Sequence, residues 1–152
     1  HTAEENGIIT TGWVRGVYPT EDTAAAAIGR GDMFVEEADG EIVGSAIINN
    51  EQAESYRGAP WRYAADNDRV TVLHTLGIDP YVKGRGFGRT FVEFYEKYAA
   101  ENGSPYLRID TNVKNLNARG FYKKLGFSEI AERPCEFNGI DGVTLVLLEK
   151  KI

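Results

Sequence analysis

The 152-residue sequence contains a single cysteine and a single methionine, and none of its apolar runs is longer than a β-strand. One cysteine cannot form an intrachain disulfide, and it cannot supply the cysteine cluster of a structural zinc site. We therefore interpret Cys135 as a small, partly buried apolar residue, and we expect no metal. Because a membrane-spanning helix needs about 20 apolar residues and no signal peptide is visible, we expect a cytoplasmic protein without a membrane partner.

Positive charge is also scarce in this chain. Lys and Arg total 17 against 23 Asp and Glu, so the formal net charge is −6. Non-specific affinity for nucleic acid comes largely from Lys and Arg, which argues against a nucleic-acid partner but not against a cationic small molecule. The 42% share of hydrophobic residues is sufficient for a core, and the length predicts one domain over residues 1–152.

The pattern of apolar residues predicts helices and strands in alternation. A helix is expected to begin after the N-cap Thr20 and to end at Gly29, and the pair Asp39-Gly40 predicts a hairpin turn. The best strand covers residues 69–78, where period-two alternation places His74 and Leu76 on one face. Other helices are expected at 87–100 and 115–125, and other strands at 33–35, 41–48, 106–110, 128–131 and 143–148. This order predicts an α/β domain with a mixed sheet.

A glycine-rich turn separates the best strand from the longest helix. Gly84, Gly86 and Gly88 leave the backbone open, and the first N–H groups of a helix have no intrahelical partner. Lys83, Arg85 and Arg89 flank these glycines with positive charge. A turn that needs glycine for its geometry alone is the simpler alternative, but the flanking bases favour a phosphate-binding turn. Neither the Walker pattern nor a dinucleotide fingerprint is present.

Two segments of the chain together resemble a known family. LGIDP (76–80) followed by KGRGFGR (83–89) is similar to the acyl-CoA signature of the GNAT superfamily of N-acyltransferases, and NLNARGFYKKLGF (115–127) is similar to its second conserved segment. Two departures are visible. Lys83 stands where the family usually has Gln or Arg, and the strand and helix that open the family fold are not found before Trp13.

The resemblance implies a GNAT-like α/β fold, with a central mixed, mostly antiparallel sheet that is flanked by helices and has a splayed central strand. It implies an N-acetyltransferase that transfers the acetyl group of acetyl-CoA to a primary amine of a small molecule or peptide, by direct attack in a ternary complex. A non-catalytic acyl-CoA-binding or sensing module is the alternative, and an acyl-protein partner without turnover is a third interpretation. A homodimer is compatible with the sequence.

The resemblance also implies roles for particular residues. The expected acetyl-CoA-binding residues are Leu76, Ile78, Lys83, Gly84, Arg85, Gly86, Phe87, Gly88, Arg89 and Asn115. Tyr122 resembles the family's general acid, with aromatic packing as the alternative role.

The general base is less strongly indicated by the sequence. His74 is either the base or a structural core histidine, and Asp110 and Glu54 are reserve candidates. The loops at 50–68 and 133–142 are expected to select the amine. Four aromatic residues either line the acceptor site or pack these loops against the domain: Tyr18, Tyr56, Trp61 and Tyr63.

Overall fold

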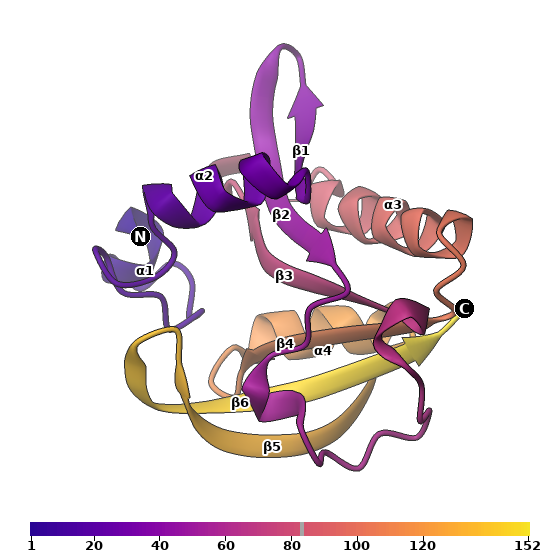
Figure 1. The fold of residues 1–152 in the computed structure, drawn as a ribbon. Coiled ribbons are helices and arrows are strands. Elements are labelled where there is room, and N and C mark those ends of the chain that lie inside the picture. The colour runs from indigo at the N-terminus through magenta and orange to yellow at the C-terminus, as the bar shows by residue number, and fades with distance from the viewer. Residues whose placement is uncertain (83) are drawn as a thin grey trace.

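A six-stranded mixed sheet forms the centre of the computed structural model, which describes residues 1–82 and 84–152 (Figure 1). The strand order is β1-β2-β3-β4-β6-β5, and only β3 and β4 are parallel neighbours. The strands are β1 (Met33–Ala38), β2 (Glu41–Asn49), β3 (Val70–Ile78), β4 (Tyr106–Asn112), β5 (Ser128–Phe137) and β6 (Ile140–Lys151). The expected mixed, mostly antiparallel sheet is therefore confirmed.

Helices cover both faces of this sheet. They are α1 (Thr2–Glu5), α2 (Glu21–Arg30), α3 (Phe87–Glu101) and α4 (Leu116–Lys124), with 3-10 turns at Glu54–Tyr56, Asn67–Arg69 and Pro80–Val82. The larger core cluster joins α3 and α4 to one face of the sheet, and α2 lies across β1 on the opposite side (Figure 1). No helix in the described part of the chain is long and apolar enough to cross a membrane.

The turn chemistry of the sequence sets most element boundaries. The Thr20 hydroxyl accepts a hydrogen bond from the Thr23 N–H at 3.3 Å and caps α2 as expected. The predicted end at Gly29 is wrong, because the helix tolerates this glycine and ends at Arg30, where Gly31 caps it with a left-handed φ of 78°. The hairpin at Asp39-Gly40 is confirmed, and both residues have positive φ.

The C-terminal hairpin is longer than the sequence predicts. The expected loop at 133–142 is wrong, since β5 continues to Phe137 and turns through Asn138-Gly139 into β6. Alternating charged residues and Pro134 lower the β propensity of this stretch. The long pairing with the apolar strand β6 outweighs that preference, and it brings the end of β5 next to the open part of the sheet.

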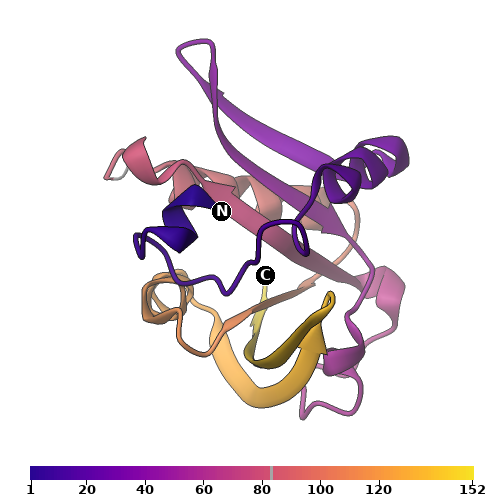
Figure 2. The same cartoon turned by 90° about the vertical axis from the view of Figure 1, so that its left-hand side faces the viewer.

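The parallel pair β3–β4 opens into a fork. Their pairing runs from Val70 opposite Tyr106 to Leu73 opposite Ile109, and beyond that point the two strands diverge (Figure 1). Figure 2 looks into this opening, which the N-terminal segment crosses. Gly12 of that segment lies against the side-chain amide of Asn112 on β4, and the ring of Trp13 lies beside Gly77 on β3.

Candidate functional site

A β-bulge interrupts β3 at the fork. Thr75 and Leu76 together oppose Ala46 of β2, and Thr75 has a left-handed φ of 54°. A threonine rarely adopts that conformation, so the surrounding structure must hold it there. The Tyr18 hydroxyl is hydrogen-bonded to Thr75 Oγ1 at 2.5 Å, which helps to fix the bulge from the N-terminal side.

The extra residue of the bulge changes which side chains share a face of β3. Val72 belongs to the core cluster on one face, and His74 follows it by simple alternation. Leu76 and Ile78, which come after the bulge, pack with the opposite cluster beneath α3. The prediction that His74 and Leu76 share a face is therefore wrong, because the period-two rule holds only in a regular strand.

Beyond the bulge, one edge of β3 faces the fork. The Asp79 N–H donates to the Val43 carbonyl of β2 at 2.9 Å. Successive N–H groups of an extended strand point to opposite edges, so the N–H groups of Leu76 and Ile78 point into the opening. This edge has the geometry to accept an extended ligand as though it were another strand.

A cavity of about 80 Å³ lies in the fork between β3, β4 and α4. Its wall brings together Leu76, Asp110, Asn115 and Tyr122, which are separated by up to 46 positions in the sequence. The fold therefore collects four of the residues singled out in the sequence around one small space.

The start of α3 lies close to α4 and to the end of β3. Gly84 and Gly86 have left-handed φ values of 82° and 88°, and a Cβ atom on either would meet no atom within 4 Å. The N–H groups of Gly86, Phe87 and Gly88 donate to no oxygen of the described residues; the first that do are those of Arg89 and Thr90, to the Gly86 carbonyl. Open N–H groups at a helix start form an anion-binding site.

The charged residues beside this turn are exposed. Arg85 forms an ion pair with Asp39 at 3.2 Å and lies over the ring of Phe87 at 5.0 Å. Arg89 lies 3.9 Å from Glu93 one helical turn later. Lys83, which the sequence places in the same turn, lies outside the described residues. The described basic groups remain available to an anion because exposed pairs of this kind are weak.

Gly88 has a different role from the two glycines before it. A Cβ atom at this position would lie 3.3 Å from Cζ of Phe121 on α4 and 3.8 Å from Ile78. Gly88 therefore allows the first turn of α3 to approach α4 and the free edge of β3. This contact places the helix start next to the residue that precedes Tyr122 in the sequence.

Tyr122 is buried on α4 and lines the fork cavity. Its ring contacts those of Phe121 and Phe127, so the packing role considered from the sequence is real. Burial, and secondarily the nearby Asp110 carboxylate, raise the pKa of Tyr122 far above its usual range. The phenol keeps its proton at neutral pH and makes no hydrogen bond with a described residue, so it can donate to a ligand in the cavity.

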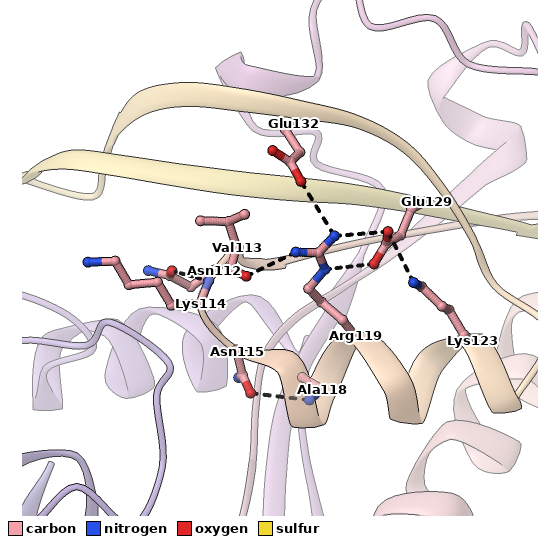
Figure 3. A network of polar contacts seen from close by, with 9 residues as sticks. All are labelled: Asn112, Val113, Lys114, Asn115, Ala118, Arg119, Lys123, Glu129 and Glu132. Carbon is pink, nitrogen blue, oxygen red and sulfur yellow. Dashed lines mark hydrogen bonds and ion pairs between the residues drawn. The ribbon is translucent and has the colours of Figure 1, made fainter.

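Asn115 holds the beginning of α4 in place. Its side-chain oxygen accepts a hydrogen bond from the Ala118 N–H at 3.1 Å, which is an N-cap (Figure 3). The oxygen is therefore committed to the helix, and the amide nitrogen is the group that can reach a ligand.

An ion-pair network anchors the outer side of α4. The Arg119 guanidinium makes two hydrogen bonds to the Glu129 carboxylate, at 2.7 and 3.0 Å, and a third to the Val113 carbonyl at 3.1 Å (Figure 3). Lys123 and Glu132 extend the network. These contacts tie α4 to β5 and to the end of β4, and so fix the position of Tyr122 on the inner side.

A second cavity of about 400 Å³ adjoins the fork on the other face of β3. Tyr18, Thr75, Asp110 and Phe137 line both cavities, so the two spaces share a wall. The larger one is also lined by residues of the 50–55 segment and of the β5–β6 turn. Its volume lies within the range of small-molecule sites, about 300–1,000 Å³.

His74 lines the larger cavity but is tied to its rim. Its Nε2 lies 3.1 Å from Asn49 Oδ1 and 3.0 Å from the Glu51 carbonyl oxygen. Since a carbonyl oxygen only accepts, Nε2 carries the proton and Nδ1 is the basic nitrogen. Burial lowers the pKa of His74, which is therefore neutral at neutral pH.

Asp110, a reserve candidate in the sequence, lies where the two cavities meet. Its Oδ2 accepts a hydrogen bond from the Tyr56 hydroxyl at 2.9 Å, and its Oδ1 accepts none from the described residues. Burial raises the pKa of this carboxyl to about 6. Asp110 thus combines a free oxygen, an intermediate pKa and contact with both spaces.

The expected aromatic residues divide into two groups. Tyr18 lines both cavities, and Tyr56 supports Asp110 from behind. Trp61 instead stacks on the Arg108 guanidinium at 4.0 Å, and Tyr63 stacks on Tyr106. Trp61 and Tyr63 therefore hold down the 50–68 loop.

The segment 133–142, which was expected to help select the amine, contributes three residues to the lining of the larger cavity, although none of them was singled out individually. Glu136, Phe137 and Asn138 come from the end of β5, in the stretch expected to be a loop. The Asn138-Gly139 turn signal was the available clue that two paired strands flank this point. Glu54, the other reserve candidate, also lines this cavity and forms an exposed ion pair with Arg57 at 3.2 Å.

A mixed sheet whose parallel strands fork beside α3 is a fold shared with acetyltransferases of known structure, and comparison with known sequences shows the family. The sequence model of the Acetyltransferase (GNAT) family matches residues 8–127. The chain belongs to this family. An uncharacterized N-acetyltransferase of Methanocaldococcus jannaschii is 29% identical over 64% of this chain, which spans only 39% of that protein's length. A 5-NmdU N-acetyltransferase of Pseudomonas phage PaMx11 is 32% identical over 72% of this chain and 66% of its own.

Solved structures share the fold. A GNAT-family acetyltransferase from Streptococcus agalactiae superposes with a TM-score of 0.80 over 99% of this chain and 83% of its own, at 23% identity. An acetyltransferase from Bacillus subtilis, solved in complex with CoA, has a TM-score of 0.65 over 89% of this chain and 86% of its own, at 17% identity. At these identities the likeness concerns the fold alone.

Proposed function

We propose that this protein transfers the acetyl group of acetyl-CoA to a primary amine of a small molecule or peptide. One observation carries the proposal: a free strand edge leads from the open N–H groups of α3 to Tyr122, and a second cavity adjoins that point. The family membership supports acyl transfer, and the CoA bound to the Bacillus subtilis neighbour supports the co-substrate. A peptidyl-lysine N-acetyltransferase of Salmonella typhimurium, 42% identical over 36% of this chain, supports an amine acceptor.

In the proposed complex, the pyrophosphate of CoA binds the N–H groups of residues 84–88, with Arg85 and Arg89 nearby. The pantetheine arm extends along the free edge of β3 and accepts from the N–H groups of Leu76 and Ile78, with Asn115 on the opposite wall. The thioester carbonyl then lies in the fork, where one of these N–H groups can stabilise the oxyanion.

The acceptor amine enters from the larger cavity. Its nitrogen lone pair forms a bond to the thioester carbon, the C–S bond breaks, and the departing thiolate takes a proton from the Tyr122 hydroxyl. No covalent intermediate with the protein is needed, because both substrates bind together.

Two groups in the acceptor cavity can take the proton of the attacking amine: Asp110 through Oδ1 and His74 through Nδ1. Asp110 fits this role better, since it alone of the two also lines the fork cavity. The Nε2 atom of His74 is already engaged with the Glu51 carbonyl, which gives this residue a structural role at the rim.

The direct test combines CoA binding with turnover. Calorimetry should detect CoA binding, and thiol release from acetyl-CoA should depend on an added amine from a panel of small amines and lysine peptides. CoA binding without turnover on any amine would instead indicate a non-catalytic acyl-CoA-binding module. The absence of CoA binding would refute the proposal as a whole.

A further inference from the structure

The larger cavity is strongly acidic. Among the described residues that line it, Glu51, Glu54, Asp110 and Glu136 supply four carboxylates from three separate parts of the chain, and Arg30 supplies the one guanidinium. That guanidinium already forms an ion pair with Asp32 at 2.9 Å. Glu54 likewise pairs with Arg57 at 3.2 Å, but this contact is exposed and therefore weak, so the lining keeps an excess of negative charge and attracts cations.

The carboxylates are distributed between an inner and an outer position. Asp110 is at the inner end, where the larger cavity adjoins the fork, and its Oδ1 has no partner among the described residues. Glu51, Glu54 and Glu136 line only the larger cavity and are exposed to solvent, so they form its outer rim. An occupant that satisfies both positions needs a cationic group at each end.

The wall between these positions is suited to a short apolar linker. The rings of Tyr18 and Phe137 meet edge to face, with centroids 5.3 Å apart, and both line the cavity. Aromatic rings of this kind pack against methylene groups and attract ammonium groups. Ser55 Oγ, also in this lining, is shielded from water without a partner in the described part of the chain.

We propose that the acceptor is a small diamine or polyamine, in which one amine is acetylated beside Asp110 and a second ammonium binds the outer carboxylates. This inference rests on the proposed acetyl transfer and narrows its substrate class. A volume of about 400 Å³ accommodates a small molecule and favours it over a folded protein segment.

A matched set of amines tests the proposal. Butane-1,4-diamine, 4-aminobutan-1-ol and butan-1-amine have similar lengths and differ at the distal group. We expect kcat/KM for the diamine to exceed that of the other two by about tenfold or more, which corresponds to about 1.4 kcal/mol for one favourable charge contact. The preference should shrink as salt is raised, because exposed charges are screened.

Variants that remove one carboxylate test whether the outer rim of the cavity causes the preference for the diamine. Glu136→Gln should reduce the preference for the diamine several-fold and leave butan-1-amine nearly unaffected. Glu41→Gln, on the exposed β1–β2 hairpin away from the cavity, removes the same charge and should leave the preference unchanged. An equal loss in both variants would mean that net charge, and not this rim, attracts the diamine.

The outcomes separate the two proposals. Turnover with equal kcat/KM for the diamine and the monoamines, or higher kcat/KM for a lysine peptide than for any diamine, would overturn this inference while leaving acetyl transfer intact. If no amine is acetylated, calorimetry with butane-1,4-diamine decides: binding that Glu136→Gln weakens supports the acidic site, and no binding refutes it.

Discussion

Asp110 makes a quantitative prediction about stability. Burial raises the pKa of its carboxyl from 3.8 to about 6, although the Tyr56 hydroxyl opposes the change. At about 1.4 kcal/mol per pH unit, this difference of about 2 makes the ionised carboxylate destabilising by about 3 kcal/mol. The cost is absent below pH 3.8, where both states are protonated, and complete above pH 6, where both are ionised.

Asp110→Asn removes this cost and keeps an oxygen for the Tyr56 hydroxyl. Relative to the parent protein, the variant should gain unfolding free energy as pH rises from about 3.5 to 7.5, by about 3 kcal/mol at most. Urea unfolding at several pH values measures the gain, and the exposed Asp141→Asn serves as the matched control. A variant whose relative stability stays flat or falls over this range would refute the assignment of a raised carboxyl pKa.

The same variant separates stability from function. If Asp110 accepts the amine proton, Asp110→Asn should lower kcat by about 10²-fold or more, while the Kd for CoA stays nearly constant. A variant that is more stable at neutral pH yet inactive would show that the buried acid is retained for its chemistry. Full activity in this variant would assign the proton to another group.

Three further substitutions test the remaining parts of the site. Tyr122→Phe keeps the ring packing and removes the proton donor, so kcat should fall by about 10²-fold while CoA affinity is unchanged. A kcat equal to that of the parent protein would exclude Tyr122 as the general acid. Gly86→Ala forces a side chain into a φ of 88°, so it should lower the free energy of unfolding by about 1–2 kcal/mol and weaken CoA binding. The control Gly120→Ala, in open space on α4, should raise the stability of the protein. Unaltered CoA affinity in Gly86→Ala would place the phosphates elsewhere. His74→Gln should raise KM for the amine, because it loosens the segment at Glu51, and it should not change the acidic limb of the pH–rate profile. Loss of that limb would identify His74 as the base instead of Asp110.

Local sequence signals predicted the parts of this fold that depend on local chemistry. The Thr20 cap, the Asp39-Gly40 turn and the glycines before α3 each require a particular residue type at a particular backbone position, and the structure shows each of them in use. The periodicity of residues 87–100 likewise predicts α3, because one face of that helix is apolar.

Two errors came from features that no local pattern encodes. The bulge at Thr75 places His74 and Leu76 on opposite faces of β3. The bulge depends on pairing with β2 and on the hydrogen bond with Tyr18, which is 57 residues away in the sequence. The extended hairpin β5–β6 depends on pairing between residues with opposite local preferences. Such contacts join distant segments, so propensity alone does not predict them.

Backbone sterics and apolar periodicity are local properties, so the order of the main strands and helices and the glycine-rich helix start can be predicted from the residues alone. The placement of Asp110, Tyr122 and Glu136 around two adjoining cavities cannot, because it depends on contacts between distant segments. The divergence of β3 from β4, together with the packing of α4 and the β5–β6 turn around it, creates a space whose walls come from separate parts of the chain.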